Sequence, residues 1–228
     1  MITRGKKHTP WFAILYGAPG VGKTTLASLA PDPVFLDLER GTDLLDVARL
    51  TLEGQDLKEA LNTLHGAEFT TLVIDSLTAL ERVHTDQLCK EKGWTTIEAL
   101  DYGRSKKMWR QEFTNLLTQV AHNFRAAGKN VLLIAHAKTR EVTDPVSQQS
   151  YDRYELDCDK DLHPQIISQV DGVFLLKQKV LVKDDKAIGN GTRVLLTTDK
   201  PQYVAKSRWP IAEEIPNPDQ EFWTSLKH

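Results

Sequence analysis

The chain has 228 residues, and its 29 Lys and Arg nearly balance its 31 Asp and Glu, giving a formal net charge of −2. This balance excludes a uniformly basic coat for nucleic acid, although it permits a local basic face. Two cysteines, Cys89 and Cys158, do not make a disulfide framework, and no segment is long and apolar enough to predict a membrane span. A reducing, cytoplasmic setting and a single domain over residues 1–228 are therefore expected.

Five short apolar runs alternate with helical or irregular stretches along most of the chain. The runs are residues 11–16, 34–38, 71–74, 131–135 and 172–176, and helix-like spacing occurs in 57–65, 76–92 and 102–127. Continuous apolar runs between helices are typical of strands that are buried on both faces of a parallel sheet. The sequence thus predicts an α/β fold with a mainly parallel sheet flanked by helices.

Two segments depart from this alternation. Residues 137–163 are polar and poorly periodic, so we expect a long loop with a function or a mobility of its own. After Lys177, two β-like runs surround turn-like residues between 184 and 191. This arrangement predicts an antiparallel hairpin that is appended to the sheet near its C-terminal end.

The stretch GAPGVGKTT, residues 17–25, directly follows the first predicted strand and precedes a helix. It contains the pattern Gly-x-x-x-x-Gly-Lys-Thr, in which glycines let the backbone N–H groups surround phosphates at the start of a helix. In this pattern Lys23 reaches the β- and γ-phosphates, and the Thr24 hydroxyl binds Mg²⁺. The residues predicted to hold the nucleotide, ATP with Mg²⁺, are Gly17, Ala18, Pro19, Gly20, Val21, Gly22, Lys23, Thr24 and Thr25.

Two acidic residues follow other predicted strands. Asp75 ends the apolar run in TTLVIDSLTAL, where a carboxylate is expected to complete the Mg²⁺ shell together with Thr24. Glu39 follows the run VFLDL. Taken alone, Glu39 is either an ordinary solvated strand end or a carboxylate directed at a reaction, and its own stretch leaves both interpretations open.

The order of these motifs resembles the core of the RecA-like ATPases. GAPGVGKTT is followed by FLDLERGTD, then LVIDSLTAL, then VLLIAHAKTR. The resemblance implies that Glu39 is the general base that activates the attacking water. It also implies that His136, which ends the fourth strand where RecA has a Gln, senses the γ-phosphate, whereas a lone His at a strand end is otherwise structural. Residues 137–163 would then be the mobile DNA loop.

Within this group the chain most resembles compact phage-encoded nucleotide-binding proteins, some of which are single-strand annealing recombinases. In RecA-like proteins and DnaB-type helicases, a late Lys-x-Lys or Lys-x-Arg pair reaches the γ-phosphate held by a neighbouring subunit. Lys206-Ser207-Arg208 resembles this pair. The resemblance implies a ring or filament with nucleotide at the subunit interface, and a phage-encoded protein would act in the host cytoplasm. An exposed basic strand end is the alternative.

Basic residues interleaved with aromatic ones are typical of proteins that bind single strands, because phosphates need charge and bases stack on rings. Residues 102–113, YGRSKKMWRQEF, have this character, although it also describes a solvated helix face. Acidic residues outnumber basic ones in 137–163, so only the start of that segment is expected to contact DNA. The residues predicted to contact single-stranded DNA are Arg104, Lys106, Lys107, Arg110, Lys138 and Arg140.

The leading interpretation is an ATPase that binds single-stranded DNA and assists recombination, annealing or repair, with a single-strand-binding or replication protein as a further partner. A small-molecule kinase shares the phosphate loop, but such kinases commonly close an Arg-rich lid, whereas the long segment here is acidic. A nucleotide-gated adaptor or loader of a replication complex is a third interpretation, in which hydrolysis is incidental.

Overall fold

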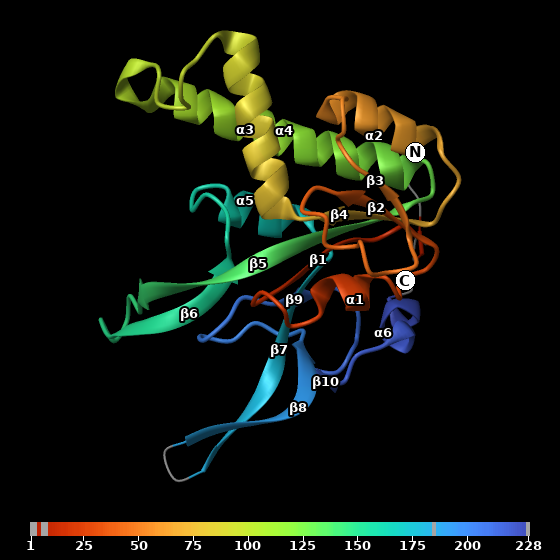
Figure 1. Ribbon diagram of the computed structural model, residues 1–228. Helices are drawn as coiled ribbons and strands as arrows, with labels where there is room; N and C mark the ends of the chain where they lie inside the picture. Colours follow the sequence, from red (N-terminus) through yellow and green to blue (C-terminus); the bar gives the residue numbers. More distant parts are fainter. Residues whose placement is uncertain (1–3, 6–8, 184–185, 227–228) are drawn as a thin grey trace.

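The protein is described by a computed structural model for residues 4–5, 9–183 and 186–226 (Figure 1). Within these residues, ten strands form one connected sheet in the order β10-β8-β7-β1-β5-β4-β2-β3, with β6 paired to β5 and β9 paired to β7. The strands are β1 (Phe12–Gly17), β2 (Pro33–Asp37), β3 (Ala48–Leu50), β4 (Thr71–Asp75), β5 (Asn130–Thr143), β6 (Ser150–Leu156), β7 (Gly172–Lys183), β8 (Lys186–Leu196), β9 (Lys206–Ser207) and β10 (Glu214–Pro216). All pairings from β7 through β1, β5, β4 and β2 to β3 are parallel, which confirms the predicted sheet.

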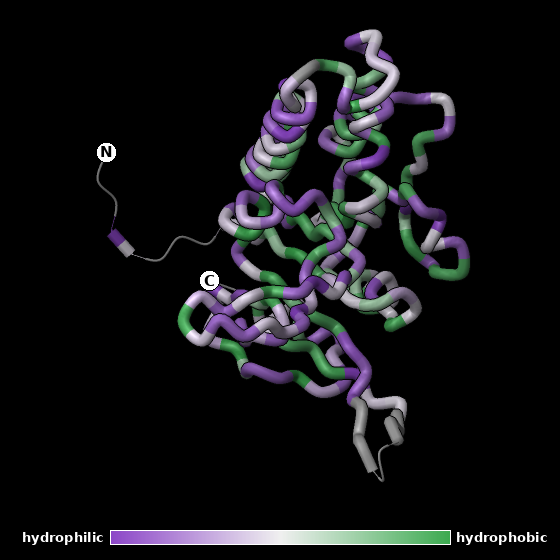
Figure 2. The backbone as a smooth tube through the Cα atoms, turned by 90° about the vertical axis from the view of Figure 1, so that its left-hand side faces the viewer, coloured by the Kyte–Doolittle hydropathy of each residue, from purple (hydrophilic) through white to green (hydrophobic). Residues whose placement is uncertain are grey.

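Helices cover both faces of this sheet. Those on one face are α2 (Leu57–Gly66), α3 (Leu77–Lys92), α4 (Arg104–Ala126) and α5 (His163–Gln169), and those on the other are α1 (Lys23–Ala27) and α6 (Gln220–Ser225) (Figure 1). A short 3₁₀ turn, η1 (Asp101–Gly103), leads into α4. Polar and apolar residues alternate along the helices (Figure 2). None of the helices in the described ranges is long and apolar enough to cross a membrane.

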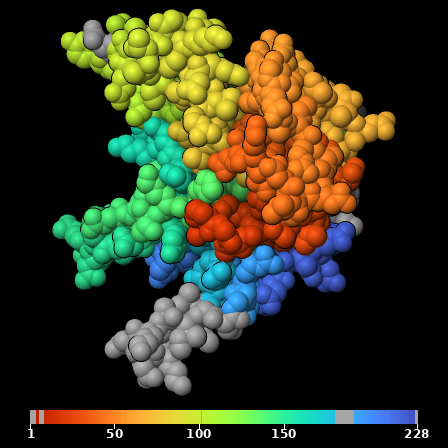
Figure 3. Space-filling view, viewed as in Figure 1, coloured from red at the N-terminus to blue at the C-terminus, as the bar shows by residue number. Residues whose placement is uncertain are grey.

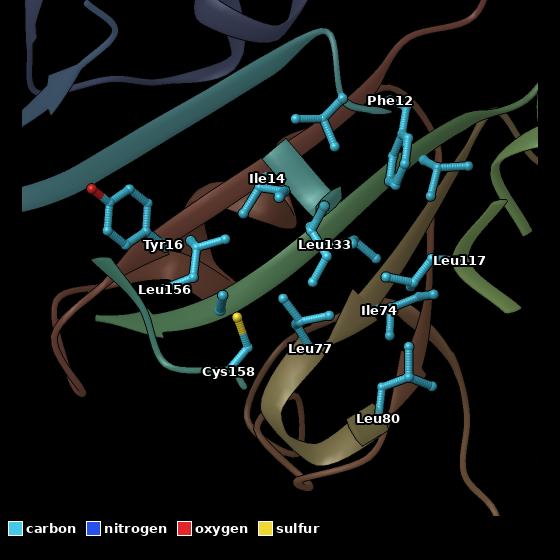
Figure 4. Packing of buried hydrophobic residues seen from close by; sticks show 14 of the residues in the cluster. Phe12, Ile14, Tyr16, Ile74, Leu77, Leu80, Leu117, Leu133, Leu156 and Cys158 are labelled. Carbon is cyan, nitrogen blue, oxygen red and sulfur yellow. The ribbon is translucent and has the colours of Figure 1, made fainter. Parts of the chain in front are cut away.

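The side chains of β1 divide between two hydrophobic cores. Phe12, Ile14 and Tyr16 pack in the larger core with α2, α3, α4 and α5, whereas Ala13 and Leu15 pack in the smaller core with α1 and α6. This alternation is the period of two that a strand imposes. Figure 4 shows the larger core, where residues of α3 and α4 meet those of β1, β4 and β5. Burial on both faces explains why the apolar runs are continuous.

The three predicted helices are confirmed, and local capping sets their ends. The α3 helix begins after Ser76, whose hydroxyl accepts a hydrogen bond from the Ala79 amide, and it is capped at its C-terminal end by Gly93 with a φ of 66°. The α2 helix begins after Asp56, which forms a capping box with Glu59. These caps supply partners for backbone groups that a helix end leaves unpaired.

The prediction of a long loop over residues 137–163 is wrong. The β5 strand continues past its parallel neighbours to Thr143 and pairs antiparallel with β6, from Ala137 opposite Leu156 to Thr143 opposite Ser150. This β5–β6 hairpin projects beyond the parallel strands (Figure 1). Residues of β6 alternate between exposed and partly buried positions, so they remain mostly polar and carry no clear apolar alternation.

The predicted C-terminal hairpin is confirmed. The β7 and β8 strands pair antiparallel, with Leu175 opposite Leu196, and their turn residues 184–185 lie outside the described residues. The sequence did not predict β10, which pairs with β8, or α6, which follows it. Trp223 of α6 stacks on Trp11 with ring centroids 5.6 Å apart and donates from Nε1 to the Leu26 carbonyl at 2.8 Å. The C-terminal segment therefore supports α1.

Candidate active site

The predicted site residues meet where the parallel strands end. The pairing of β1 with β5 places Gly17 opposite His136, and the pairing of β2 with β4 places Asp37 opposite Asp75. A cleft at the carboxyl ends of strands is where open α/β sheets bind ligands. This cleft has a volume of about 320 Å³ and is lined by Pro19, Gly20, Gly22, Lys23, Thr24, Thr25, Glu39, Gly41, Asp75 and His136. Figure 3 shows the N-terminal segment that contains the phosphate loop (red) reaching the surface between the β5–β6 hairpin and the C-terminal strands.

The phosphate loop connects β1 to α1. Gly20 and Gly22 have φ values of 73° and 95°, in the left-handed region that side chains other than glycine rarely adopt. The Lys23 ammonium is buried and donates to the carbonyls of Gly17 and Ala18, both at 3.0 Å. Burial lowers the pKa of Lys23, and the carboxylates of Asp75 and Glu39 oppose this effect. The loop thus holds the Lys23 ammonium beside the cleft through these two carbonyls.

Thr24 and Asp75 form the oxygen-rich side of the cleft. Thr24 Oγ1 donates to Asp75 Oδ2 at 2.7 Å, and Asp75 is buried at the end of β4. Burial raises the pKa of Asp75, while the hydrogen bond from Thr24 acts in the opposite direction. A hydroxyl and a carboxylate side by side are hard oxygen ligands of the kind that Mg²⁺ uses together with nucleotide phosphates and water. These two residues therefore fit the predicted metal.

The Glu39 carboxylate is held by residues from two other strands. Ser76 Oγ, which follows β4, donates to Glu39 Oε1 at 2.7 Å, and His136 Nε2 of β5 lies 3.2 Å from Glu39 Oε2. Glu39 itself follows β2, so three separate strand ends converge on this carboxylate. An ordinary solvated strand end has no such partners. The arrangement favours the interpretation of Glu39 as a group directed at a reaction.

Asp37 has a role that the sequence analysis did not assign. It is only 2% exposed, and its Oδ1 accepts hydrogen bonds from the amides of Glu39 at 3.3 Å and Gly41 at 3.1 Å. Its Oδ2 accepts from the Thr42 amide at 3.1 Å. Asp37 therefore shapes the loop that carries Glu39. Its place inside an otherwise apolar run was the signal, because a buried carboxylate needs such donors.

His136 connects the cleft with the β5–β6 hairpin. While its Nε2 lies against Glu39, its backbone carbonyl accepts a hydrogen bond from the Asp157 amide at 2.9 Å, directly after β6. Its Nδ1 is buried without a hydrogen-bond partner among the described residues. His136, the predicted γ-phosphate sensor, therefore contacts Glu39 in the cleft through its side chain and the base of the β5–β6 hairpin through its backbone.

Lys206 and Arg208 do not enter the cleft of their own chain. The β9 strand pairs with the first residues of β7, at the end of the parallel strands opposite to the phosphate loop. Lys206 Nζ donates to the carbonyls of Ile167 and Val170 at 2.9 and 2.7 Å, and Arg208 Nη1 pairs with the buried Asp171 at 2.5 Å. A role at a neighbouring subunit remains a prediction, and it requires these contacts to exchange.

Two basic residues of α4 that were predicted to contact DNA are engaged within the chain. Arg110 forms ion pairs with Asp159 at 2.8 Å and Asp161 at 2.7 Å, and Lys106 lies 3.6 Å from Asp159. The hydrogen bond to Asp159 raises the pKa of Arg110. The acidic segment after β6 thus neutralises this part of α4. Arg104 and Lys107 are exposed on the same helix.

The two basic residues at the start of the β5–β6 hairpin that were predicted to contact DNA also form ion pairs within the chain. Lys138 Nζ lies 3.4 Å from Asp157 Oδ1, and Arg140 Nε lies 3.4 Å from Glu155 Oε2. Arg140 also donates to the Cys158 carbonyl at 2.8 Å. Both side chains are therefore engaged in ion pairs within the chain.

Glu81 of α3 lies beneath this acidic segment. Its Oε2 accepts a hydrogen bond from the Asp159 amide at 3.3 Å. Burial, with the nearby charges of Asp159 and Asp157, raises the pKa of Glu81 from its ordinary 4.5 to about 7, although that hydrogen bond and Lys106 act in the opposite direction. The folded state binds this proton more tightly than the unfolded chain. The contribution of this proton to the free energy of unfolding is fully present below about pH 4.5 and is lost as the pH rises through about 7.

We expect Glu81→Gln to raise the melting temperature at pH 8 and to change it little at pH 5, because the amide stays uncharged when Glu81 would ionise. Solvent screening at this partly buried position reduces the effect to about 1 kcal/mol, or roughly 2–4 °C. Melting curves at both pH values measure it, with the exposed Glu98→Gln as the matched control. An equal shift at both pH values would contradict the account of Glu81.

Comparison with known proteins gives one family. A family model described as an AAA domain matches residues 9–209. The matched range begins just before β1 and ends just after β9, so it contains every residue that lines the cleft. No curated protein matches the chain.

Proposed function

Because the chain belongs to the AAA domain family of P-loop ATPases, we propose that it binds ATP with Mg²⁺ in the cleft and hydrolyses it with a water molecule that Glu39 activates. Lys23 and the amides of the phosphate loop hold the β- and γ-phosphates in this proposal. Thr24 and Asp75 hold Mg²⁺, which offsets charge on the phosphates.

The reaction needs few chemical groups from the protein. The water oxygen bonds to the γ-phosphorus as the bond to the ADP oxygen breaks, and the proton that the water loses passes to the Glu39 carboxylate. The Lys23 ammonium stabilises negative charge on the phosphate oxygens. Ser76 and His136 keep Glu39 directed at the cleft, so the carboxylate does not have to reorganise during the reaction.

One observation carries this proposal, namely the Glu39 carboxylate fixed by Ser76 and His136 beside the phosphate loop. Product analysis tests it. Hydrolysis yields ADP and free phosphate in equal amounts, whereas a small-molecule kinase yields a phosphorylated acceptor. A product mixture without free phosphate would overturn the proposal and favour the kinase.

We propose single-stranded DNA as the ligand that the ATPase serves, in recombination, annealing or repair. The support is an exposed group at the start of α4, where Tyr102 is 100% exposed and Arg104 and Lys107 are exposed nearby. A fully exposed aromatic ring beside basic residues fits a strand whose bases stack and whose phosphates need charge. Lys106, Arg110, Lys138 and Arg140 form ion pairs with acidic residues of the chain, so a phosphate would compete with those residues at these four positions.

We expect Tyr102→Ala to weaken binding of a single-stranded oligonucleotide by on the order of tenfold, since one stacked base is lost. Fluorescence anisotropy measures the affinity, and it should fall steeply as salt increases. Leu44→Ala, which removes an apolar side chain that is 99% exposed between β2 and β3, is the matched control. ATP turnover that does not respond to the oligonucleotide, together with equal affinities for both variants, would contradict the DNA proposal and favour the adaptor.

We also propose that the active protein is a ring or filament, in which Lys206 and Arg208 serve the nucleotide of a neighbouring subunit. The support is the resemblance of Lys206-Ser207-Arg208 to the pair that acts between subunits in RecA-like proteins. Their place at the far end of the parallel strands is compatible with a role outside their own cleft.

A further inference from the structure

Arg193 of β8 lies against the phosphate loop. A Cβ atom at Gly22 would collide with Arg193 Nη1, and Arg193 Cζ lies 3.6 Å from the position that this Cβ would take. Gly22 directly precedes Lys23, so the guanidinium lies beside the part of the loop that is predicted to surround the phosphates. The missing side chain of Gly22 is what makes room for it.

The backbone around Arg193 is held in place by the C-terminal segment. The Arg193 amide donates to Asn217 Oδ1 at 3.1 Å, and the Asn217 amide donates to the Arg193 carbonyl at 2.7 Å. On the other side, Arg193 lies opposite Gln178 of β7. Both edges of β8 are thus paired at this residue, and the position of Arg193 follows from the sheet rather than from a loop.

The guanidinium of Arg193 has no hydrogen bond or ion pair within the part of the chain that the structure describes. Other arginines near the sheet differ in this respect. The arginines that form ion pairs include Arg110, Arg125, Arg140, Arg153 and Arg208. A guanidinium carries five N–H donors and matches phosphate oxygens in geometry, so Arg193 is a cation whose partner is expected to be an anion at the loop.

We propose that Arg193 contacts the phosphates of the nucleotide bound in its own chain, and that it acts as a second cation beside Lys23. This inference rests on the proposed ATPase function. It assigns Arg193 of β8 a direct part in nucleotide binding, with Asn217 holding the Arg193 backbone in place. Arg208, by comparison, is held by Asp171 and cannot reach the same cleft without rearrangement.

Equilibrium binding of ATP and of inorganic triphosphate tests the proposal. Arg193→Gln is expected to weaken binding of both ligands at least tenfold, the loss typical of one charge-assisted hydrogen bond. Arg193→Lys is expected to recover part of the affinity. In steady-state turnover, KM for ATP should rise by a similar factor with kcat within about twofold, because the contact is equally present in the ground and transition states.

Lys179→Gln removes one charge from the same hairpin at an exposed position and is the matched control. The melting temperature of each variant shows whether that variant folds. If Arg193→Gln does not fold, the comparison with the wild-type protein is made with Arg193→Lys instead. Unchanged affinities in a folded Arg193→Gln protein would overturn this inference and leave the ATPase proposal intact. Loss of ATP binding without loss of triphosphate binding would also overturn it, since the contact would then be to the nucleoside. Absence of ATP binding by the wild-type protein would instead refute the proposed function.

Discussion

Glu39→Gln is expected to bind ATP with Mg²⁺ almost as well as the wild-type protein and to hydrolyse it about 10²–10⁴ times more slowly. The amide keeps the shape of the carboxylate and can still accept a hydrogen bond from Ser76 Oγ, but it cannot take a proton from water. Turnover assays and equilibrium binding of ATP separate the two effects. A decrease in kcat without an increase in KM is the expected signature.

The matched control is Glu53→Gln, which removes one negative charge from an exposed ion pair with Arg40. This variant should retain wild-type turnover. Glu39 would lose its assigned role if Glu39→Gln hydrolysed ATP at the wild-type rate. If Glu39→Gln and Glu53→Gln lost turnover to the same extent, the cause would be a general effect of charge rather than the loss of proton transfer to Glu39.

Lys23→Ala is expected to weaken ATP binding on the order of 10²-fold or more, because a buried ammonium that would face the phosphates is removed. The carbonyls of Gly17 and Ala18 also lose their donor, so the melting temperature is measured beside the affinity. Lys58→Ala, at an exposed position on α2, is the control and should bind normally. A folded Lys23→Ala protein with wild-type affinity would remove the phosphate loop from the account.

Lys23→Ala, combined with Arg208→Ala, also tests whether the nucleotide site is shared between neighbouring subunits. Arg208→Ala should retain ATP binding and lose most turnover, and mixing it with Lys23→Ala should restore part of the activity, because some interfaces then combine an intact loop with an intact Arg208. The ion pair between Arg208 and Asp171 requires a stability measurement as well. Full turnover by folded Arg208→Ala protein would contradict the shared site.

The sheet and the phosphate loop could be predicted because their signals are local. Strands buried on both faces must be apolar throughout, and the loop needs glycine where φ is positive, as at Gly20 and Gly22. The positions of Asp75 and His136 follow, since the carboxyl ends of parallel strands meet at one edge of the sheet. The close approach of Glu39 to His136 is a consequence of that sheet order.

Other features could not be predicted because they depend on contacts between distant parts of the chain. Arg110 appears in a basic helical stretch, and nothing nearby shows that Asp159, far along the chain, will neutralise it. The polar β5–β6 hairpin is held by backbone pairing, which leaves little trace in composition. Arg193 is unremarkable in sequence and becomes significant only when β8 brings it against Gly22.

The central claim is that the γ-phosphoryl group of ATP is transferred to water in this cleft, and its most direct test follows the oxygen atoms. Wild-type protein, ATP and Mg²⁺ are mixed in water labelled with heavy oxygen, and the released phosphate is examined by mass spectrometry after a single turnover. We predict free phosphate that carries at least one oxygen from the solvent, together with an equal amount of ADP. Unlabelled phosphate, or a γ-phosphoryl group found on another acceptor, would contradict the account.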